Sequence, residues 1–361
     1  MKKLILRLCL FIPILLVIAA INFSVDPANL FSGDAYITGI AKIMLSGKNV
    51  ANVENYDERL LQKKYIEGLQ QAKDVIALGS SRSMQITASL FSGKTFFNNS
   101  VSGATLEDLI AIYQLYSDHG LQPSIVILGI DPWIFNESYN YNLWRTLSNE
   151  YQTGINNLGL DVPDHLTSSL NSLELEKLFQ IVSPSYFQGS IHQLLIHGWQ
   201  RSSYYSTNVI ESDVPIRTFD GSYSYPSEYR LASLDQVRQR VENVINQPID
   251  TGFEHYIYLD PQRILILRNF IDILKTEGVQ VAIFLPPEHP IYYDYLVNSE
   301  NHRIILKVQK LLINIGIEKG ITVLGSYNPD DIPCQENEFY DFHHPKSSCI
   351  EKVFKNNNYF Q

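Results

Sequence analysis

The apolar positions of the chain fall into two alternating patterns. Short β-branched runs bounded by turn residues are typical of buried strands, whereas apolar side chains every three or four residues are typical of helices. Because strands that alternate with helices favour a parallel sheet, the pattern predicts an α/β fold with a central five-stranded parallel sheet. The predicted strands cover residues 74–78, 95–99, 125–131, 279–285 and 321–324.

The alternation of strand and helix patterns divides the chain into one interrupted domain and two further segments. Residues 74–135 and 257–361 carry the predicted strands. Residues 136–256 are rich in Tyr, Asn and Ser and predict a largely helical insertion or cap, while residues 25–73 predict a stalk and a first packing helix. The helical patterns of the insertion lie near residues 173–182, 188–199 and 234–245.

The first 24 residues form a targeting or anchoring segment. Lys2, Lys3 and Arg7 precede an apolar run at residues 8–21. A cleaved signal peptide has this layout, and so has an uncleaved single-pass anchor, which needs about 20 apolar residues. We expect an anchoring transmembrane helix, because the residues near Ala20 fit a cleavage site poorly. In either case the positive flank places the rest of the chain outside the cytoplasm.

The rest of the chain is acidic. The formal net charge is −10, although the first 24 residues carry three basic side chains and no acidic one. An acidic body repels phosphate, so we expect no nucleic-acid partner and no electrostatic docking of the body on anionic lipid. The membrane, reached through the N-terminal helix, is the partner that the residues themselves indicate.

The first predicted strand leads directly into a serine-rich turn, Gly79-Ser80-Ser81. A side chain just past a strand of a parallel sheet lies at the carboxyl edge, where ligands bind in open α/β folds. A serine there can offer a hydroxyl nucleophile and a backbone N–H for a developing oxyanion. The alternative is an ordinary strand-to-helix turn in which serine caps the helix.

A second candidate group lies near the C-terminus, where Asp341, His343 and His344 stand on a predicted loop before a short helix. In an Asp-x-x-His spacing, one nitrogen of His344 can take a proton from a nucleophile while the other donates to Asp341. His343 is the adjacent competitor for this role. Zinc is the alternative for an acid and two histidines, but no other clear His or Cys cluster accompanies them, so we expect no metal and no other cofactor.

Two cysteines, Cys334 and Cys349, bracket this C-terminal group. Outside the cytoplasm such a pair can form a disulfide, and the alternative is two free thiols. We regard the pair as a disulfide candidate that would close a loop carrying both Asp341 and His344.

Taken together, these blocks resemble the SGNH (GDSL-type) hydrolases, a superfamily of esterases and acyl transferases with a three-layer α/β fold. Gly79-Ser80-Ser81 is similar to the family's Gly-Asp-Ser turn, which puts the nucleophile at Ser81. The segment around Gly103 is similar to the block whose glycine N–H lines the oxyanion hole. The resemblance implies a triad of Ser81, His344 and Asp341, with oxyanion donors at the N–H groups of Ser81 and Gly103.

Two positions, Asp131 and Arg82, are not explained by this resemblance. Asp131 replaces the Asn of the family's Gly-x-Asn block, and a carboxylate cannot donate a hydrogen bond to an oxyanion. Asp131 could instead orient Arg82 or a substrate hydroxyl, or cap the turn before Pro132. Arg82 could hold Asp131, Asp341 or an anionic substrate, or lie on the surface. We therefore regard Arg82, Asp131 and His343 as candidate substrate or support residues.

The N-terminal anchor, the Gly-Ser-Ser turn and the long insertion narrow the resemblance to membrane-tethered proteins of the cell envelope. That branch is similar to alginate O-acetyltransferases and to a protein of D-alanyl-lipoteichoic acid biosynthesis. It implies a serine esterase or O-acyltransferase on the periplasmic or outer face of the cell membrane, acting on a cell-surface glycan or an acyl carrier. The rival expectation is a non-catalytic binding or scaffold protein on the same fold, which the Asp131 departure favours.

Overall fold

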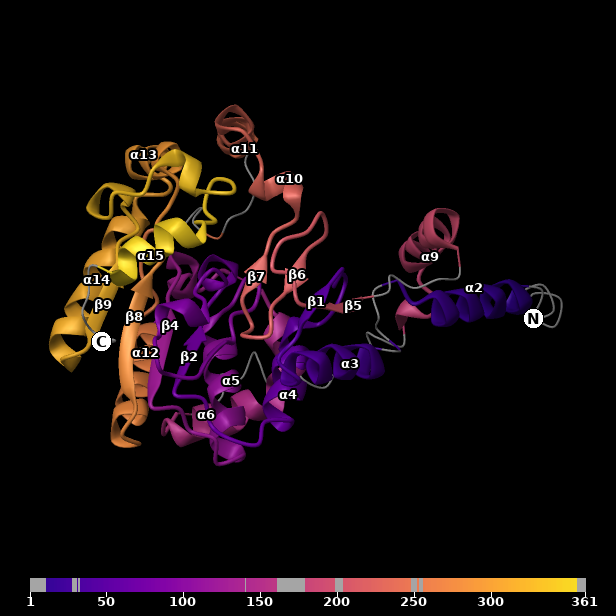
Figure 1. The fold of residues 1–361 in the computed structure, drawn as a ribbon, viewed down its shortest axis with the longest axis horizontal. Coiled ribbons are helices and arrows are strands. Elements are labelled where there is room, and N and C mark those ends of the chain that lie inside the picture. The colour runs from indigo at the N-terminus through magenta and orange to yellow at the C-terminus, as the bar shows by residue number, and fades with distance from the viewer. Residues whose placement is uncertain are drawn as a thin grey trace, which may run out of the picture.

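The structure, a computed structural model, describes residues 11–27, 31, 33–139, 141–160, 179–198, 204–247, 252 and 256–355. Within these residues the chain forms a mixed α/β fold with two sheets and many helices (Figure 1). Most of the helical pattern expected at residues 173–182 lies outside the described residues.

A five-stranded parallel sheet forms the centre of the fold, as the sequence predicts. Its order is β3-β2-β4-β8-β9, so the long segment between β4 and β8 leaves the sheet and returns to the adjacent position. Because β2 lies between β3 and β4, the turns that follow these three strands meet at one edge. The strands are β2 (Val75–Leu78), β3 (Phe96–Asn98), β4 (Ile125–Gly129), β8 (Gln280–Leu285) and β9 (Thr322–Gly325).

Helices cover both faces of this sheet. Ile76, Val126 and Val281 pack against α5, α12 and α14, while Ala77, Ile127 and Ala282 pack against α15. Successive residues of a strand point to opposite faces, so strands buried on both sides are apolar throughout. These helices are α5 (Leu106–Asp118), α12 (Pro261–Thr276), α14 (Ile304–Lys319) and α15 (Ser347–Lys355).

A second, antiparallel sheet joins the N-terminal segment to the insertion. Its order is β5-β1-β6-β7, with β1 paired to β5 on one side and to β6 on the other. The insertion is therefore not as helical as expected, because three of its segments are strands. The strands are β1 (Asn49–Ala51), β5 (Tyr205–Thr207), β6 (Ile216–Arg217) and β7 (Tyr223–Ser224).

The described residues between 33 and 73 pack as part of the body, in the manner of the expected first packing helix and not of a stalk. Helices α3 (Gly33–Leu45) and α4 (Glu58–Glu67) share an apolar cluster with β1 and with Phe97 of the central sheet. The ring of Tyr65 stacks on Phe97 with a centroid separation of 3.7 Å. This contact fixes α4 beside the edge strand β3.

The N-terminal helix α2 (Ile12–Val25) packs against α9 (Pro184–His197) of the insertion. No helix of the described residues is both long enough and apolar enough to cross a membrane, so the expected N-terminal membrane helix has no support there. Of the expected insertion helices, two are present as α9 and α11. The remaining helices are α6 (Ser148–Asn157), α10 (Ser227–Arg230), α11 (Leu234–Asn246) and α13 (Pro290–Asn298).

Candidate active site

The turn after β2 holds Ser81 at the carboxyl edge of the central sheet. Ser80 caps this turn, because its Oγ accepts a hydrogen bond from the Arg82 N–H at 3.1 Å. The serine that caps this turn is therefore Ser80, and the hydroxyl of Ser81 is available for another contact. A Cβ on Gly79 would lie 2.6 Å from the Ser83 Oγ, so the strand end requires glycine for close approach.

The structure brings Ser81 together with His344 and Asp341. Ser81 Oγ lies 2.8 Å from His344 Nε2, across a sequence separation of 263 residues. On the other side of the ring, His344 Nδ1 lies 2.8 Å from one carboxylate oxygen of Asp341 and 3.0 Å from the other. A carboxylate on Nδ1 makes that nitrogen the protonated one, so Nε2 is free to accept the serine proton.

Asp341 is held in its ionised form. Its Oδ1 accepts hydrogen bonds from the backbone N–H groups of His343 and His344, both at 3.0 Å. Burial alone would raise the pKa of Asp341, but the His344 ring and these N–H donors lower it well below its ordinary value. The carboxylate therefore stays charged at neutral pH and can orient the imidazole.

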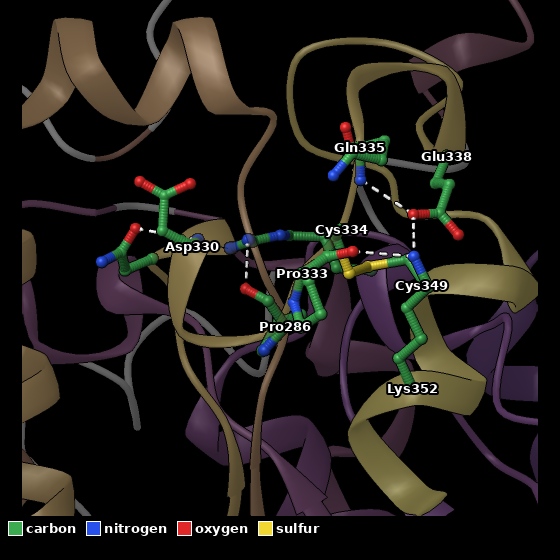
Figure 2. Close-up of a disulfide and its surroundings, with 10 residues drawn as sticks. Pro286, Asp330, Pro333, Cys334, Gln335, Glu338, Cys349 and Lys352 are labelled. Carbon is green, nitrogen blue, oxygen red and sulfur yellow. Dashed lines mark hydrogen bonds and ion pairs between the residues drawn. A yellow bond between two sulfur atoms is a disulfide. The ribbon is translucent and has the colours of Figure 1, made fainter. Parts of the chain in front are cut away.

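A disulfide holds the loop that carries Asp341 and His344. Cys334 and Cys349 are bonded, with their Cα atoms 5.3 Å apart, which confirms the disulfide candidate (Figure 2). Both half-cystines are buried. Within the loop the Tyr340 N–H donates to the His344 carbonyl at 2.9 Å. The bond and this turn together restrict the position of the imidazole.

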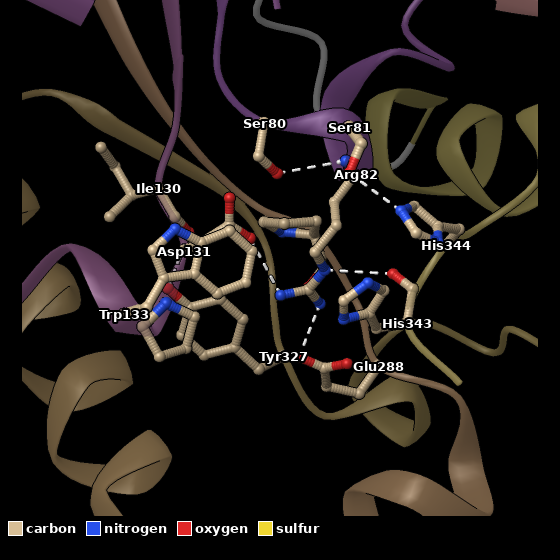
Figure 3. A network of polar contacts seen from close by, with 12 residues as sticks. Ser80, Ser81, Arg82, Ile130, Asp131, Trp133, Glu288, Tyr327, His343 and His344 are labelled. Carbon is tan, nitrogen blue, oxygen red and sulfur yellow. Dashed lines mark hydrogen bonds and ion pairs between the residues drawn. The ribbon is translucent and has the colours of Figure 1, made fainter. Parts of the chain in front are cut away.

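Arg82 is buried beneath the site, so the surface alternative is wrong. Its Nη1 donates to Asp131 Oδ1 at 2.9 Å, and its Nη2 donates to the Pro286 carbonyl at 2.6 Å. Its Nε donates to the His343 carbonyl at 3.1 Å (Figure 3). With each nitrogen engaged and no exposed surface, Arg82 is a support residue that joins the Ser81 turn to the His344 loop.

Two buried carboxylates share the Arg82 guanidinium, and the sequence indicated only one of them. Asp131 pairs with Arg82, which was one of the expected roles of this carboxylate. Its side chain does not cap the turn at Pro132. Glu288 Oε1 lies 2.8 Å from Arg82 Nη2 and forms a buried ion pair with it. Burial raises the pKa of Asp131, and it raises that of Glu288 to about 8. A signal for Glu288 existed, since it follows the Pro-Pro turn after β8.

His343 does not compete with His344 for the serine. Its ring packs against Phe342 and Trp133, with centroid separations of 3.9 Å and 6.4 Å, and burial lowers its pKa well below the ordinary value. The side chains of Asp341, His343 and His344 form the group among the described residues that is close enough to hold a metal ion. In His344, however, Nε2 contacts Ser81 and Nδ1 contacts Asp341, so both ring nitrogens already have a partner.

Comparison with known proteins identifies a family. A family model with the description "Protein of unknown function (DUF1574)" matches residues 4–356. The chain belongs to the DUF1574 family. No curated protein and no solved structure matches the chain. The DUF1574 match spans both sheets and all of the site residues, so the family model includes the candidate site as well as the fold.

The DUF1574 chain has a cavity of about 1000 Å³ in front of Ser81 and His344. Residues 53–59 line it from the N-terminal segment, and several residues between 215 and 226 line it from the insertion. Among these residues, Tyr225 lies beside His344, with ring centroids 5.9 Å apart. The sequence did not indicate these walls, because they consist mostly of residues that flank the strands of the second sheet, and those strands are only two or three residues long.

One predicted oxyanion donor lies at this DUF1574 cavity and the other lies next to it. Ser81 lines the cavity, whereas Ser102 lines it in place of its neighbour Gly103. Gly103 has a φ of +58°, and a Cβ there would lie 2.4 Å from the Tyr141 ring. Glycine is therefore required at this turn both by conformation and by space.

Proposed function

We propose that this protein is a serine-dependent esterase or O-acyltransferase of the cell envelope. The observation that carries the proposal is the continuous contact from Asp341 through His344 to Ser81, with 2.8 Å at each step. A serine hydroxyl is a weak nucleophile until an adjacent base removes its proton. The arrangement supplies that base and the carboxylate that orients it.

In the proposed reaction, Ser81 Oγ attacks the carbonyl carbon of an acyl ester while His344 Nε2 takes the hydroxyl proton. The new C–O bond gives a tetrahedral intermediate, whose oxyanion accepts from the N–H groups of Ser81 and Gly103. The ester C–O bond then breaks, and His344 returns the proton to the departing alcohol. Water or an acceptor hydroxyl next attacks the acyl-serine, with His344 again as the base, and Ser81 is regenerated.

The acyl ester on a glycan or an acyl carrier remains the proposed substrate. The cavity has the volume of a small-molecule site, and Tyr223 and Tyr225 on its wall could stack on sugar rings. Asp131 is held by Arg82 and supplies no oxyanion donor, so the proposed hole relies on two backbone N–H groups.

Two features support a location outside the cytoplasm. The disulfide between Cys334 and Cys349 is a bond that persists in oxidising compartments. The basic residues and the apolar run at the N-terminus are the layout of a tether or signal segment. We therefore place the proposed reaction on the periplasmic or outer face of the membrane.

Labelling by a fluorophosphonate probe, which reacts with activated serines, tests the proposal on the full-length protein. We expect the wild type to be labelled and Ser81→Ala to remain unlabelled, with ester hydrolysis lower by about 10⁴-fold or more. Ser89→Ala is the matched control, because Ser89 is exposed and does not line the cavity. Equal labelling of the wild type and Ser81→Ala would remove Ser81 from the nucleophile role. Glycan binding without turnover would instead favour a binding protein.

A further inference from the structure

Two short helices from distant parts of the chain carry a concentration of exposed apolar side chains. Leu16 and Val17 of α2 are 63% and 58% exposed, and Leu195 of α9 is 81% exposed. The two helices pack against each other, and Figure 1 shows them projecting together away from the α/β body. The other exposed apolar side chains here are Phe11 just before α2, Ile12, Ile14, Leu15 and Phe23 of α2, and Phe179 and Val182 just before α9.

Neither helix contains an Asp, Glu, Lys or Arg residue. A helix whose outer face contacts water normally carries charged side chains there. Helix α14 shows this usual pattern, since its exposed Ile317 is followed by Glu318 and Lys319. An uncharged patch of this extent indicates a surface that is covered by an apolar partner.

The buried polar groups of the two helices pair with each other, while Ser185, Gln188 and His192 of α9 are exposed polar side chains on its outer side. Asn22 is fully buried, and its Nδ2 donates to the Ile181 carbonyl at 2.9 Å. Ser190 Oγ donates to Asn22 Oδ1 at 2.9 Å, and the Tyr186 hydroxyl donates to Asp26 Oδ1 at 2.7 Å. Internal pairing of polar groups is the arrangement that a hydrocarbon environment requires, because lipid offers no hydrogen-bond partner.

Charge favours lipid over a second apolar protein surface. Lys2, Lys3 and Arg7 precede α2, and the first acidic residue of the chain is Asp26. Basic residues beside an apolar helix attract anionic headgroups. Each helix has 14 residues, or about 21 Å at 1.5 Å per residue, which suits insertion at the boundary between headgroups and acyl chains.

We propose that α2 and α9 form a membrane-docking unit whose exposed apolar side chains enter the acyl region of an anionic bilayer. The N-terminal segment is thus joined at the membrane by a second helix from the middle of the chain. The inference extends the proposed envelope location, and it does not depend on the chemistry of Ser81.

A fluorescent reporter at position 195 tests the docking of α9. Leu195→Cys, on a Cys9→Ser background, is labelled with the environment-sensitive dye NBD in the full-length protein. The disulfide cysteines do not react in the absence of a reductant. The protein is reconstituted with vesicles of phosphatidylethanolamine and phosphatidylglycerol. We expect nitroxides on the acyl chains to quench the dye, and aqueous iodide to quench it several-fold less than at a control position.

Ile317→Cys on α14 is the matched control, because its side chain is 77% exposed on the α/β body. Equal iodide quenching at positions 195 and 317 would overturn the proposal. Protection from both iodide and the nitroxides, with energy transfer between labelled copies, would overturn it in favour of a dimer. Val182→Cys provides a second reporter if Leu195→Cys does not fold. Adding Ser81→Ala should leave the quenching unchanged, which separates this test from the proposed reaction.

Discussion

Replacing Arg82 tests whether the buried ion network holds the His344 loop against the nucleophile turn. Arg82→Met removes the donors to the His343 and Pro286 carbonyls and leaves Asp131 and Glu288 buried without a cation. Removing one partner of a buried ion pair typically costs about 3–5 kcal/mol of unfolding free energy. We expect a loss of that size for Arg82→Met. Arg82→Lys should recover little of it, because one ammonium group cannot match the planar fork of a guanidinium.

The same variant should lower turnover more than substrate binding. Arg82 does not line the cavity, so KM should change little. The His343 carbonyl that it holds is adjacent to His344, and a displacement of about 1 Å in a catalytic group can cost about 10²-fold in rate. Adding Glu288→Gln to Arg82→Met should restore part of the stability only at alkaline pH, where the Glu288 carboxyl would otherwise be ionised and unpaired.

Urea unfolding followed by circular dichroism, together with kcat and KM for ester hydrolysis, checks this reasoning. Arg263→Met is the control, since Arg263 pairs with Glu107 at a partly exposed position on α12 and should cost at most about 1 kcal/mol. If Arg82→Met unfolds at the wild-type urea concentration and keeps its kcat, the network does not position the loop. If only stability falls, the guanidinium is structural and has no influence on His344.

Three further predictions concern the loop and its surroundings. Replacing both Cys334 and Cys349 by Ser should lower the unfolding free energy by about 3 kcal/mol, the chain-entropy value for a 15-residue loop; equal urea midpoints with and without the bond would contradict this. The raised pKa of Glu288 means that the folded state keeps a proton that the unfolded state releases, so this residue should make stability fall between pH 4.5 and about 8, by roughly 1.4 kcal/mol per pH unit. Urea titrations across that range should show a steeper fall in stability in the wild type than in Glu288→Gln. Asp341→Asn should lower kcat by about 10⁴-fold with the fold intact by circular dichroism, and near-wild-type turnover would show that the carboxylate does not orient the imidazole.

The central sheet could be predicted because its strands are buried on both faces. Burial of both faces makes a strand such as β4 apolar without interruption, and this pattern is visible in one sequence. The second sheet could not be predicted in the same way. β6 has two residues and pairs with β1, more than 160 positions away, so no local pattern of useful length exists.

The triad residues could be predicted from a resemblance, whereas the burial of Arg82 and Glu288 beneath them could not. Ser81, Asp341 and His344 stand in short motifs next to strand ends and loops, so their types and spacing were informative. Arg82 carried no such information, because the sequence gives a charge but neither its burial nor its partners. Its partner Glu288 is distant in sequence, and only the parallel order of β2, β4 and β8 places their ends together.

The pairing of β1 with β5 and β6 means that two separate stretches of the chain together form the cavity in front of Ser81. A shortened protein that began at β2 would retain Ser81 and His344 but would lose the wall formed by residues 53–59. Deleting the insertion would remove the opposite wall and expose the edges of β1. A substitution that reshapes the cavity from one stretch therefore has to be compatible with the wall that the other stretch forms.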